Sequence, residues 1–246
     1  MRKDLFGHTR TDIQTRHALI TEDGYVPSTI PGWESAECNI VISGGLGARL
    51  NMWFASAPPG ATVHGTTGNL ELFLYVLEGA ADNDSNALLP GSYLYVPPES
   101  EYSLTARENS RWLIFEKRYE ALHGVAPPEP FSGNQADAQG EPFLGNPDAL
   151  LQTLLPDTAA FDMAVNIFTY QPGATLPFVE THIMEHGLLM LSGQGVYRLD
   201  EKYYPVREGD AIWMAPWCPQ WFVCMGKEPA SYIYYKDINR HPKPTP

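Results

Sequence analysis

Apolar and polar residues alternate along much of this chain in short runs with a period of two. In residues 161–170, positions 161, 163, 165 and 167 are apolar and would lie on one face of an extended strand. Residues 212–215 and 232–235 follow the same pattern, and 21 glycines and 22 prolines separate such runs. This pattern predicts many short β-strands. We expect a helix at residues 148–155, which lie between two prolines.

A weak internal repeat divides the chain into two similar parts. Four segments of the first part recur in the same order in the second, at an offset of about 113 to 119 positions. The paired segments are 59–62 with 172–175, 72–79 with 186–193, 90–97 with 208–216, and 115–117 with 234–236. Two copies of this length indicate a duplicated domain and not a solenoid. Residues 119–160 are rich in proline, glycine and polar residues, so we expect them to connect the copies.

The composition restricts the classes of partner. A formal charge of −13 and a pI near 4.9 argue against nucleic acid and anionic membranes. An apolar content of 43%, with 12% aromatic residues, is typical of a folded domain. No apolar run approaches the roughly 20 residues that span a bilayer. Residues 1–8 contain no apolar signal core, which predicts a cytoplasmic protein. Three cysteines are too few for a disulfide framework, and we interpret Cys218 as a buried thiol.

The candidate chemistry lies in residues 180–186 and at Gln220. Glu180 and His182 are two positions apart, so on a strand they share a face, and His186 begins the next apolar run. Imidazole nitrogens together with oxygen ligands suit a first-row divalent ion, and the lack of sulfur argues against a closed structural zinc site. Four such ligands would leave two positions open on an octahedral ion. The alternative is a polar turn that carries surface histidines.

The order of these features resembles the cupin β-barrel: a Pro-Gly turn, a ligand cluster, an apolar strand ending in glycine, and a Glu-Gly-Asp turn before a further strand. Cupins normally carry His-x-His and then Glu in the first motif, with another His in the second. Here Glu180 stands at the first His, His186 at the Glu, and Gln220 near the last His. This altered set of residues at the ligand positions resembles that of the (S)-ureidoglycine aminohydrolase family. The segments that carry the resemblance cover nearly the whole chain: 30–33, 73–76, 178–187, 191–197 and 231–240.

The resemblance implies an all-β fold, namely a bicupin of two tandem β-barrels of the jelly-roll type with a few short helices. We expect an N-terminal extension at residues 1–40 that packs on the barrels, and a first barrel at 41–118. A connector at 119–160 would lead to the second barrel, at 161–246, with the metal site. Since bicupins commonly assemble through barrel edges and helices, we also expect a homo-oligomer.

The first barrel serves as an internal comparison for the metal site. Thr66, Gly68 and Leu72 occupy the positions that match Glu180, His182 and His186. We therefore expect no metal in the first barrel, and a role for it in packing and oligomer contacts.

The family resemblance also implies a manganese-dependent enzyme of allantoin and ureide (purine) catabolism. It would hydrolyse a small molecule, (S)-ureidoglycine, to (S)-ureidoglycolate and ammonia. The implied ligands of Mn²⁺, or of another first-row divalent ion, are Glu180, His182, His186 and Gln220. The implied substrate contacts are Tyr197, Tyr232, Lys236 and Glu180. Of these, Glu180 and Lys236 are the candidates for catalytic proton transfer.

The residues alone leave several alternatives open. Tyr197 and Tyr232 could be core aromatics, Lys236 could be a solvated residue at a strand end, and a register shift of one residue would turn Gln220 away from the metal. The tryptophans 213, 217 and 221 could shape and dry the pocket or belong to ordinary barrel packing. The rival functions are another metal-dependent cupin enzyme, such as a dioxygenase or an isomerase, and a cupin that binds a small acid without catalysis.

Overall fold

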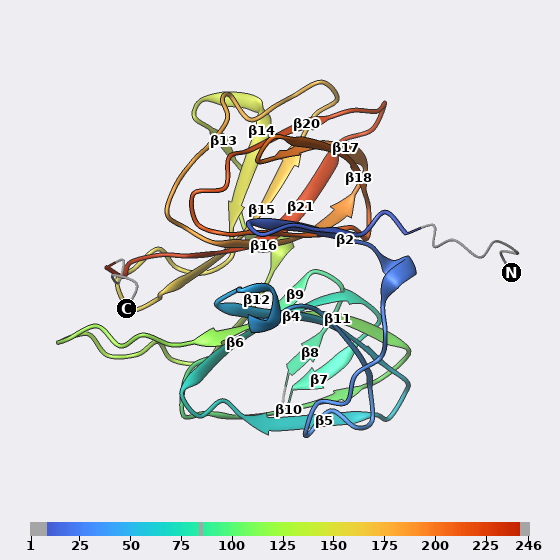
Figure 1. Ribbon diagram of the computed structural model, residues 1–246. Coiled ribbons are helices and arrows are strands. Elements are labelled where there is room, and N and C mark those ends of the chain that lie inside the picture. Colours follow the sequence, from blue (N-terminus) through green and yellow to red (C-terminus); the bar gives the residue numbers. More distant parts are fainter. Residues whose placement is uncertain (1–8, 84–85, 242–246) are drawn as a thin grey trace, which may run out of the picture.

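Strands make up nearly all of the regular structure in the computed structural model, which describes residues 9–83 and 86–241 (Figure 1). The predicted all-β fold is confirmed. The helices in this part of the chain are three short 3-10 turns, η1 (Glu22–Gly24), η2 (Gly44–Leu46) and η3 (Gln135–Asp137). No helix among the described residues is both long and apolar enough to cross a membrane. Residues 1–8, on which the expectation of a missing signal segment rests, lie outside the described residues.

The N-terminal half contains a six-stranded sheet in the order β12-β9-β6-β11-β4-β3 and a four-stranded sheet in the order β5-β10-β7-β8. All neighbouring strands in both sheets are antiparallel. The strands are β3 (Glu37–Ile42), β4 (Leu50–Ala57), β5 (Thr62–Thr66), β6 (Leu70–Glu78), β7 (Ala81–Asn83), β8 (Asn86–Leu88), β9 (Ser92–Val96), β10 (Glu101–Ala106), β11 (Ser110–Arg118) and β12 (Phe131–Asn134).

The C-terminal half contains an eight-stranded sheet in the order β1-β2-β19-β16-β21-β15-β14-β13 and a three-stranded sheet in the order β18-β17-β20. Its strands are β1 (Asp12–Ile13), β2 (His17–Ile20), β13 (Glu141–Phe143), β14 (Asn146–Thr153), β15 (Met163–Tyr170), β16 (His186–Ser192), β17 (Gln194–Leu199), β18 (Lys202–Arg207), β19 (Ala211–Met214), β20 (Gln220–Cys224) and β21 (Ala230–Asp237).

The sheet orders repeat the duplication seen in the sequence. The order β9-β6-β11-β4-β3 in the first half matches β19-β16-β21-β15-β14 in the second. Both copies of the Pro-Gly turn place the glycine in the left-handed region, with φ of 80° at Gly60 and 85° at Gly173, where a side chain would be strained.

Strands outside the repeats complete the large sheets. From the N-terminal segment, β2 pairs with β19 of the C-terminal half, so that the first strands of the chain lie in the upper half of Figure 1. From the segment between the repeats, β12 pairs with β9 of the N-terminal half, whereas β13 and β14 join the C-terminal sheet. Each half therefore depends on chain that lies beyond its own repeat.

The helix expected at residues 148–155 is wrong, because Asn146–Thr153 form strand β14. Five residues of this strand, from Ala149 to Thr153, pair with β15. A helix here would leave the outer edge of β15 without hydrogen-bond partners. The free-energy cost of leaving buried backbone groups unpaired is larger than the free energy gained from the helix propensity of these residues.

Three hydrophobic cores separate the four sheets. One fills the space between the two sheets of the N-terminal half, and another fills the C-terminal half. The third joins the six-stranded and eight-stranded sheets, whose facing surfaces form the junction of the two halves. Strand β21 shows the division: Tyr232 and Tyr234 lie in the interior of the C-terminal half, while Ile233 and Tyr235 lie in the junction. Successive residues of β21 thus face the interior of the C-terminal half and the junction in turn.

Candidate functional site

A cavity of about 170 Å³ lies inside the C-terminal half. The seven residues implied by the resemblance all line it: Glu180, His182, His186, Tyr197, Gln220, Tyr232 and Lys236. They come from the segment before β16 and from the strands β16, β17, β20 and β21. The fold therefore brings together, at one place, residues that lie up to 56 positions apart in the sequence.

The two histidines face each other. His182 precedes β16 and His186 begins it, and their ring Nε2 atoms are 3.2 Å apart. The other ring nitrogen of His186, Nδ1, lies 3.2 Å from the main-chain oxygen of Tyr235. A carbonyl oxygen can only accept, so Nδ1 carries the proton and Nε2 presents a lone pair to the cavity. Burial lowers the pKa of both imidazoles, that of His186 well below its usual value. Both rings are therefore neutral at physiological pH.

Glu180 and Gln220 enter the cavity as a pair. Their main chains form an antiparallel bridge with two hydrogen bonds, Glu180 N to Gln220 O at 2.8 Å and Gln220 N to Glu180 O at 2.9 Å. A Glu180 carboxylate oxygen lies 3.9 Å from His182 Nε2. The Tyr197 hydroxyl donates to the side-chain oxygen of Gln220 at 3.1 Å, and the Gln220 amide nitrogen lies 2.9 Å from His182 Nε2. The register of this bridge turns Gln220 inward.

The donor atoms fit a divalent cation. If the Gln220 amide donates to His182, then both histidine Nε2 atoms point lone pairs at each other, an arrangement that a cation between them would stabilise. A half-turn of the amide would present its oxygen to the same space, since the Tyr197 hydroxyl can accept as well as donate. In the described part of the chain, no three His, Cys, Asp or Glu side chains form a metal-binding group by themselves. Glu180, His182 and His186 therefore do not form such a group in this structure, and the side-chain amide of Gln220, whose nitrogen lies 2.9 Å from His182 Nε2, is a further polar group in the same cavity.

One wall of the cavity follows the alternation of strand β21. Tyr232, Tyr234 and Lys236 all line it, as the spacing of two residues requires. The Tyr232 hydroxyl lies 3.2 Å from that of Tyr170, and the Tyr234 hydroxyl accepts from Asn166 at 3.1 Å. Tyr234 was absent from the residues expected at the site, although it shares the face of Tyr232 and Lys236 and could have been found from that spacing.

Burial is the main cause of the pKa shifts of the acidic groups that line the cavity. Burial raises the pKa of the Glu180 carboxyl, and the nearby positive charge of Lys236 opposes that shift. Burial also raises the pKa of the hydroxyls of Tyr197 and Tyr232 far above the usual value. Both tyrosines are therefore neutral donors and acceptors of hydrogen bonds.

The apolar part of the lining differs from the expectation. The tryptophans do not dry the cavity, because Trp213, Trp217 and Trp221 are absent from its lining. Trp213 lies on the opposite face of β19 within the junction core, and Trp217 is 55% exposed. The apolar side chains that do line the cavity are Phe143, Leu151, Phe168, Met184, Leu188 and Met214. Cys218 is buried, as expected, and burial raises the pKa of its thiol to about 11.

Comparison with known proteins agrees with the fold and covers nearly the whole chain. Residues 166–235 match the family model described as cupin domain. The (S)-ureidoglycine aminohydrolase of Arabidopsis thaliana is 36% identical over 98% of this chain and 82% of its own length. The (S)-ureidoglycine aminohydrolase of Escherichia coli is 36% identical over 97% of this chain and 95% of its own length.

Solved structures agree with the fold. The crystal structure of protein YlbA from E. coli has a TM-score of 0.84 at 32% identity and covers 96% of this chain and 97% of its own. Oxalate decarboxylase of Bacillus subtilis has a TM-score of 0.72 at 11% identity, over 96% of this chain and 80% of its own, and shows the fold alone. At 36% identity over nearly the full length of both chains, the chain belongs to the (S)-ureidoglycine aminohydrolase family of cupin proteins.

Proposed function

We propose that this protein is a manganese-dependent enzyme that hydrolyses (S)-ureidoglycine to (S)-ureidoglycolate and ammonia. The observation that carries the proposal is the convergence of Glu180, His182, His186 and Gln220 with three further polar side chains in one small cavity. Membership of the family, whose relatives are named (S)-ureidoglycine aminohydrolases, supports the same substrate. The cavity is smaller than the roughly 300–1,000 Å³ of pockets for drug-sized ligands, which suits a small polar substrate.

The metal ligands in this proposal are Glu180, His182, His186 and Gln220. Two neutral imidazoles and two oxygen donors, without sulfur, suit a first-row divalent ion such as Mn²⁺. A bound divalent ion supplies positive charge that holds and polarises a substrate oxygen. The proposed substrate contacts, Tyr197, Tyr232 and Lys236, line the same cavity.

The reaction replaces an amino group with a hydroxyl on a carbon that also bears a ureido group and a carboxylate. The C–N bond breaks while the amine takes up a proton, and a C–O bond forms to water, which gives up a proton. Lys236 and Glu180 are the groups that can donate the first proton and take back the second. Tyr197 and Tyr232, both neutral, hold the substrate by hydrogen bonds and fix the face that water approaches.

The proposal is tested by ammonia release from (S)-ureidoglycine, formed in situ from allantoate because it decays on its own. Manganese-loaded protein is compared with chelated protein after the spontaneous background is subtracted. We expect metal-dependent release that yields one enantiomer of ureidoglycolate. No acceleration by protein whose metal content has been verified would exclude this activity and favour another cupin reaction, which an oxygen-uptake assay would detect for a dioxygenase.

A further inference from the structure

Two clusters of polar residues at the junction, each centred on a buried glutamate, occupy equivalent positions of the duplicated fold. Leu72 pairs with Val96 and Glu116 in the first half, just as His186 pairs with Met214 and Lys236 in the second. The register of the strands therefore equates Glu71 with Glu185, Tyr95 with Trp213, Lys117 with Asp237, and Asp162 with Arg49. In each cluster the central glutamate meets a residue from the opposite half.

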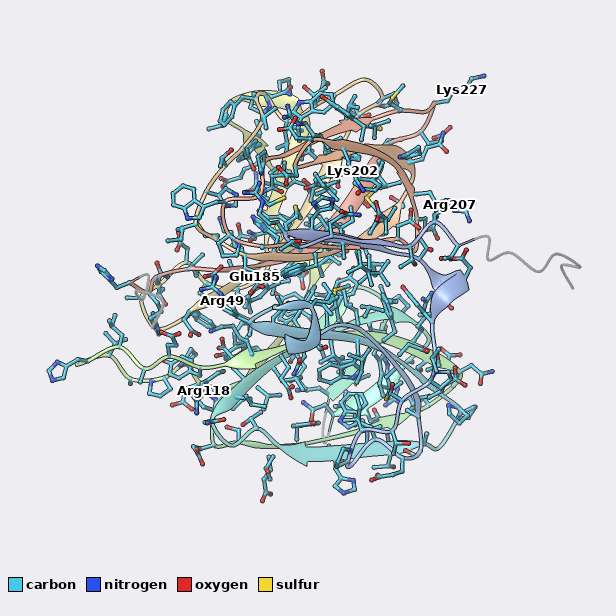
Figure 2. All side chains as sticks on the ribbon, in the orientation of Figure 1. Arg49, Arg118, Glu185, Lys202, Arg207 and Lys227 are labelled. Atoms are coloured by element: carbon cyan, nitrogen blue, oxygen red, sulfur yellow. The ribbon has the colours of Figure 1, made fainter. Side chains whose placement is uncertain are left out.

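The C-terminal cluster is centred on Glu185, which is 1% exposed. The main-chain N–H of Arg49, from the N-terminal half, lies 3.0 Å from both carboxylate oxygens of Glu185. Trp213 donates its indole N–H to the same carboxylate at 2.8 Å. The guanidinium of Arg49 reaches on to Asp237 at 2.9 Å, and Asp237 accepts the main-chain N–H of Glu185 at 2.5 Å. Figure 2 shows Arg49 and Glu185 next to each other where the halves meet.

This cluster adjoins the candidate site through the alternation of the strands. Glu185 immediately precedes His186, and Asp237 immediately follows Lys236. Successive residues of a strand point to opposite faces, so the carboxylates point to the junction while His186 and Lys236 point into the cavity. His186 and Lys236 are also direct cross-strand neighbours. Whatever fixes Glu185 and Asp237 therefore fixes the direction of the two cavity residues.

Close packing of the two halves reinforces this connection at Gly187. A Cβ atom there would lie 3.0 Å from a methyl group of Leu50 and 3.1 Å from one of Ile42, both in the N-terminal half. The backbone beside His186 thus rests directly on the first half, and interiors packed this closely transmit small displacements.

The equivalent cluster, centred on Glu71 in the N-terminal half, does not adjoin a candidate site. Glu71 accepts from the Tyr95 hydroxyl at 2.7 Å and lies 3.5 Å from the Lys117 amine, which pairs with Asp162 of the C-terminal half. It adjoins Leu72, which is buried in the apolar interior of the first half. This cluster can stabilise the junction, but it borders no polar cavity.

We propose that Glu185 is a positioning residue, held by Arg49 of the N-terminal half, that fixes how His186 and Lys236 enter the cavity. The N-terminal half thereby acquires a role in the chemistry of the C-terminal site. The proposal rests on the proposed function, since it assigns His186 and Lys236 their tasks there. Replacing a group that hydrogen-bonds to a metal ligand typically changes metal affinity or activity by about 10-fold to 100-fold, and we take the lower end of this range for Glu185, which acts on His186 through the backbone.

The test compares Glu185→Gln with Glu71→Gln, which makes the same change at the equivalent position away from the site. Titration of the metal-free proteins with Mn²⁺, followed by calorimetry, gives the dissociation constants. We expect the dissociation constant to rise about 10-fold or more in Glu185→Gln and to stay near the wild-type value in Glu71→Gln. Arg49→Met should shift it in the same direction but less, because the main-chain N–H remains, while Arg111→Met, which removes another arginine bordering the junction, should not.

A second readout needs no metal. The ring ¹⁵N chemical shifts of His186 in metal-free protein report which nitrogen carries the proton. We expect a single tautomer protonated on Nδ1 in the wild type and Glu71→Gln, and a mixture in Glu185→Gln. Unchanged Mn²⁺ affinity together with an unchanged tautomer in Glu185→Gln would overturn the positioning role. A wild-type protein that neither binds Mn²⁺ nor releases ammonia would instead overturn the proposed function, and the tautomer comparison would still decide the role of Glu185.

Discussion

His182 and His186 direct their Nε2 atoms at each other across 3.2 Å, inside a cavity where burial keeps both rings neutral. The proton of His186 is on the opposite nitrogen, where it meets the main-chain oxygen of Tyr235. If His182 Nε2 accepts a hydrogen bond from Gln220, neither of the two facing Nε2 atoms carries a proton that could form a hydrogen bond between the rings. A cation is then the group that stabilises the pair.

Addition of Mn²⁺ to chelator-treated protein should therefore raise the melting temperature. Binding to the folded state alone adds about 2.7 kcal/mol of stability when free metal is 100 times the dissociation constant. In a chain of this size that corresponds to roughly 5–10 °C. Differential scanning calorimetry of the chelated protein, with and without Mn²⁺, measures the difference.

The matched variant is His186→Leu, because Leu72 occupies the equivalent position in the first half. It should fold without metal at least as well as the wild type, since a buried imidazole gives way to an apolar side chain. Its melting temperature should no longer respond to Mn²⁺. An equal response in wild type and variant would place the ion outside this cavity.

Replacing Tyr197 by Phe should weaken the site without harming the fold. The hydroxyl donates to Gln220 at 3.1 Å and is fully buried, so its loss frees the Gln220 amide to turn. We expect kcat/KM for ureidoglycine to fall about 10-fold, while stability falls by about 1 kcal/mol. Tyr75→Phe, which removes a hydroxyl hydrogen bond in the first half, is the control for stability. Equal kcat/KM in the two variants would mean that Gln220 is fixed by its main chain alone.

Lys236→Met should separate proton transfer from metal binding. Lys236 lines the cavity but is not among the proposed ligands, so Mn²⁺ affinity should stay within about 2-fold of the wild type. Loss of a positioned proton-transfer group lowers rates by about 10²–10⁴-fold. Steady-state ammonia release at saturating Mn²⁺ measures the effect. A variant that retains the wild-type kcat would assign proton transfer to Glu180.

The features that the sequence predicted correctly follow from local patterns, from the internal repeat and from the family resemblance. Alternation of apolar residues located β15, β19 and β21, and the repeated segments foretold the matching sheet orders of the two halves. Glu180, His182, His186, Tyr232 and Lys236, the set that the family resemblance implied, line one cavity. The alternation uses neighbours within a few positions, where the geometry of a strand fixes the outcome, whereas the repeat compares segments about 113 to 119 positions apart.

The features that escaped prediction depend on long-range pairing. Residues 148–155 resemble a helix locally, but the pairing of β14 with both β15 and β13 decides its conformation. Phe143 reaches the cavity because β13 pairs with β14. The contact of Arg49 with Glu185 spans 136 positions and requires the two halves to be docked. No local pattern contains this information, since it arises from the packing of sheets onto each other.

The junction should also make stability depend on pH through Glu71. Complete burial, and next the adjacent Asp162 carboxyl, raise the pKa of Glu71 from 4.5 to about 8. Between these values the folded protein keeps a proton that the unfolded chain releases, so this group's contribution to stability is full below about pH 4.5 and is lost as the pH rises through about 8.

Urea unfolding at about pH 5.5 and pH 7.5 should therefore show a larger fall in stability for the wild type than for Glu71→Gln, whose amide does not titrate. The limit for one proton is about 1.4 kcal/mol per pH unit, so we expect a difference of about 1–2 kcal/mol over this interval. Glu101→Gln, at an exposed position of β10, is the control and should follow the wild type. Parallel pH profiles for wild type and Glu71→Gln would mean that Glu71 is ionised in the folded protein, with Lys117 compensating both carboxylates.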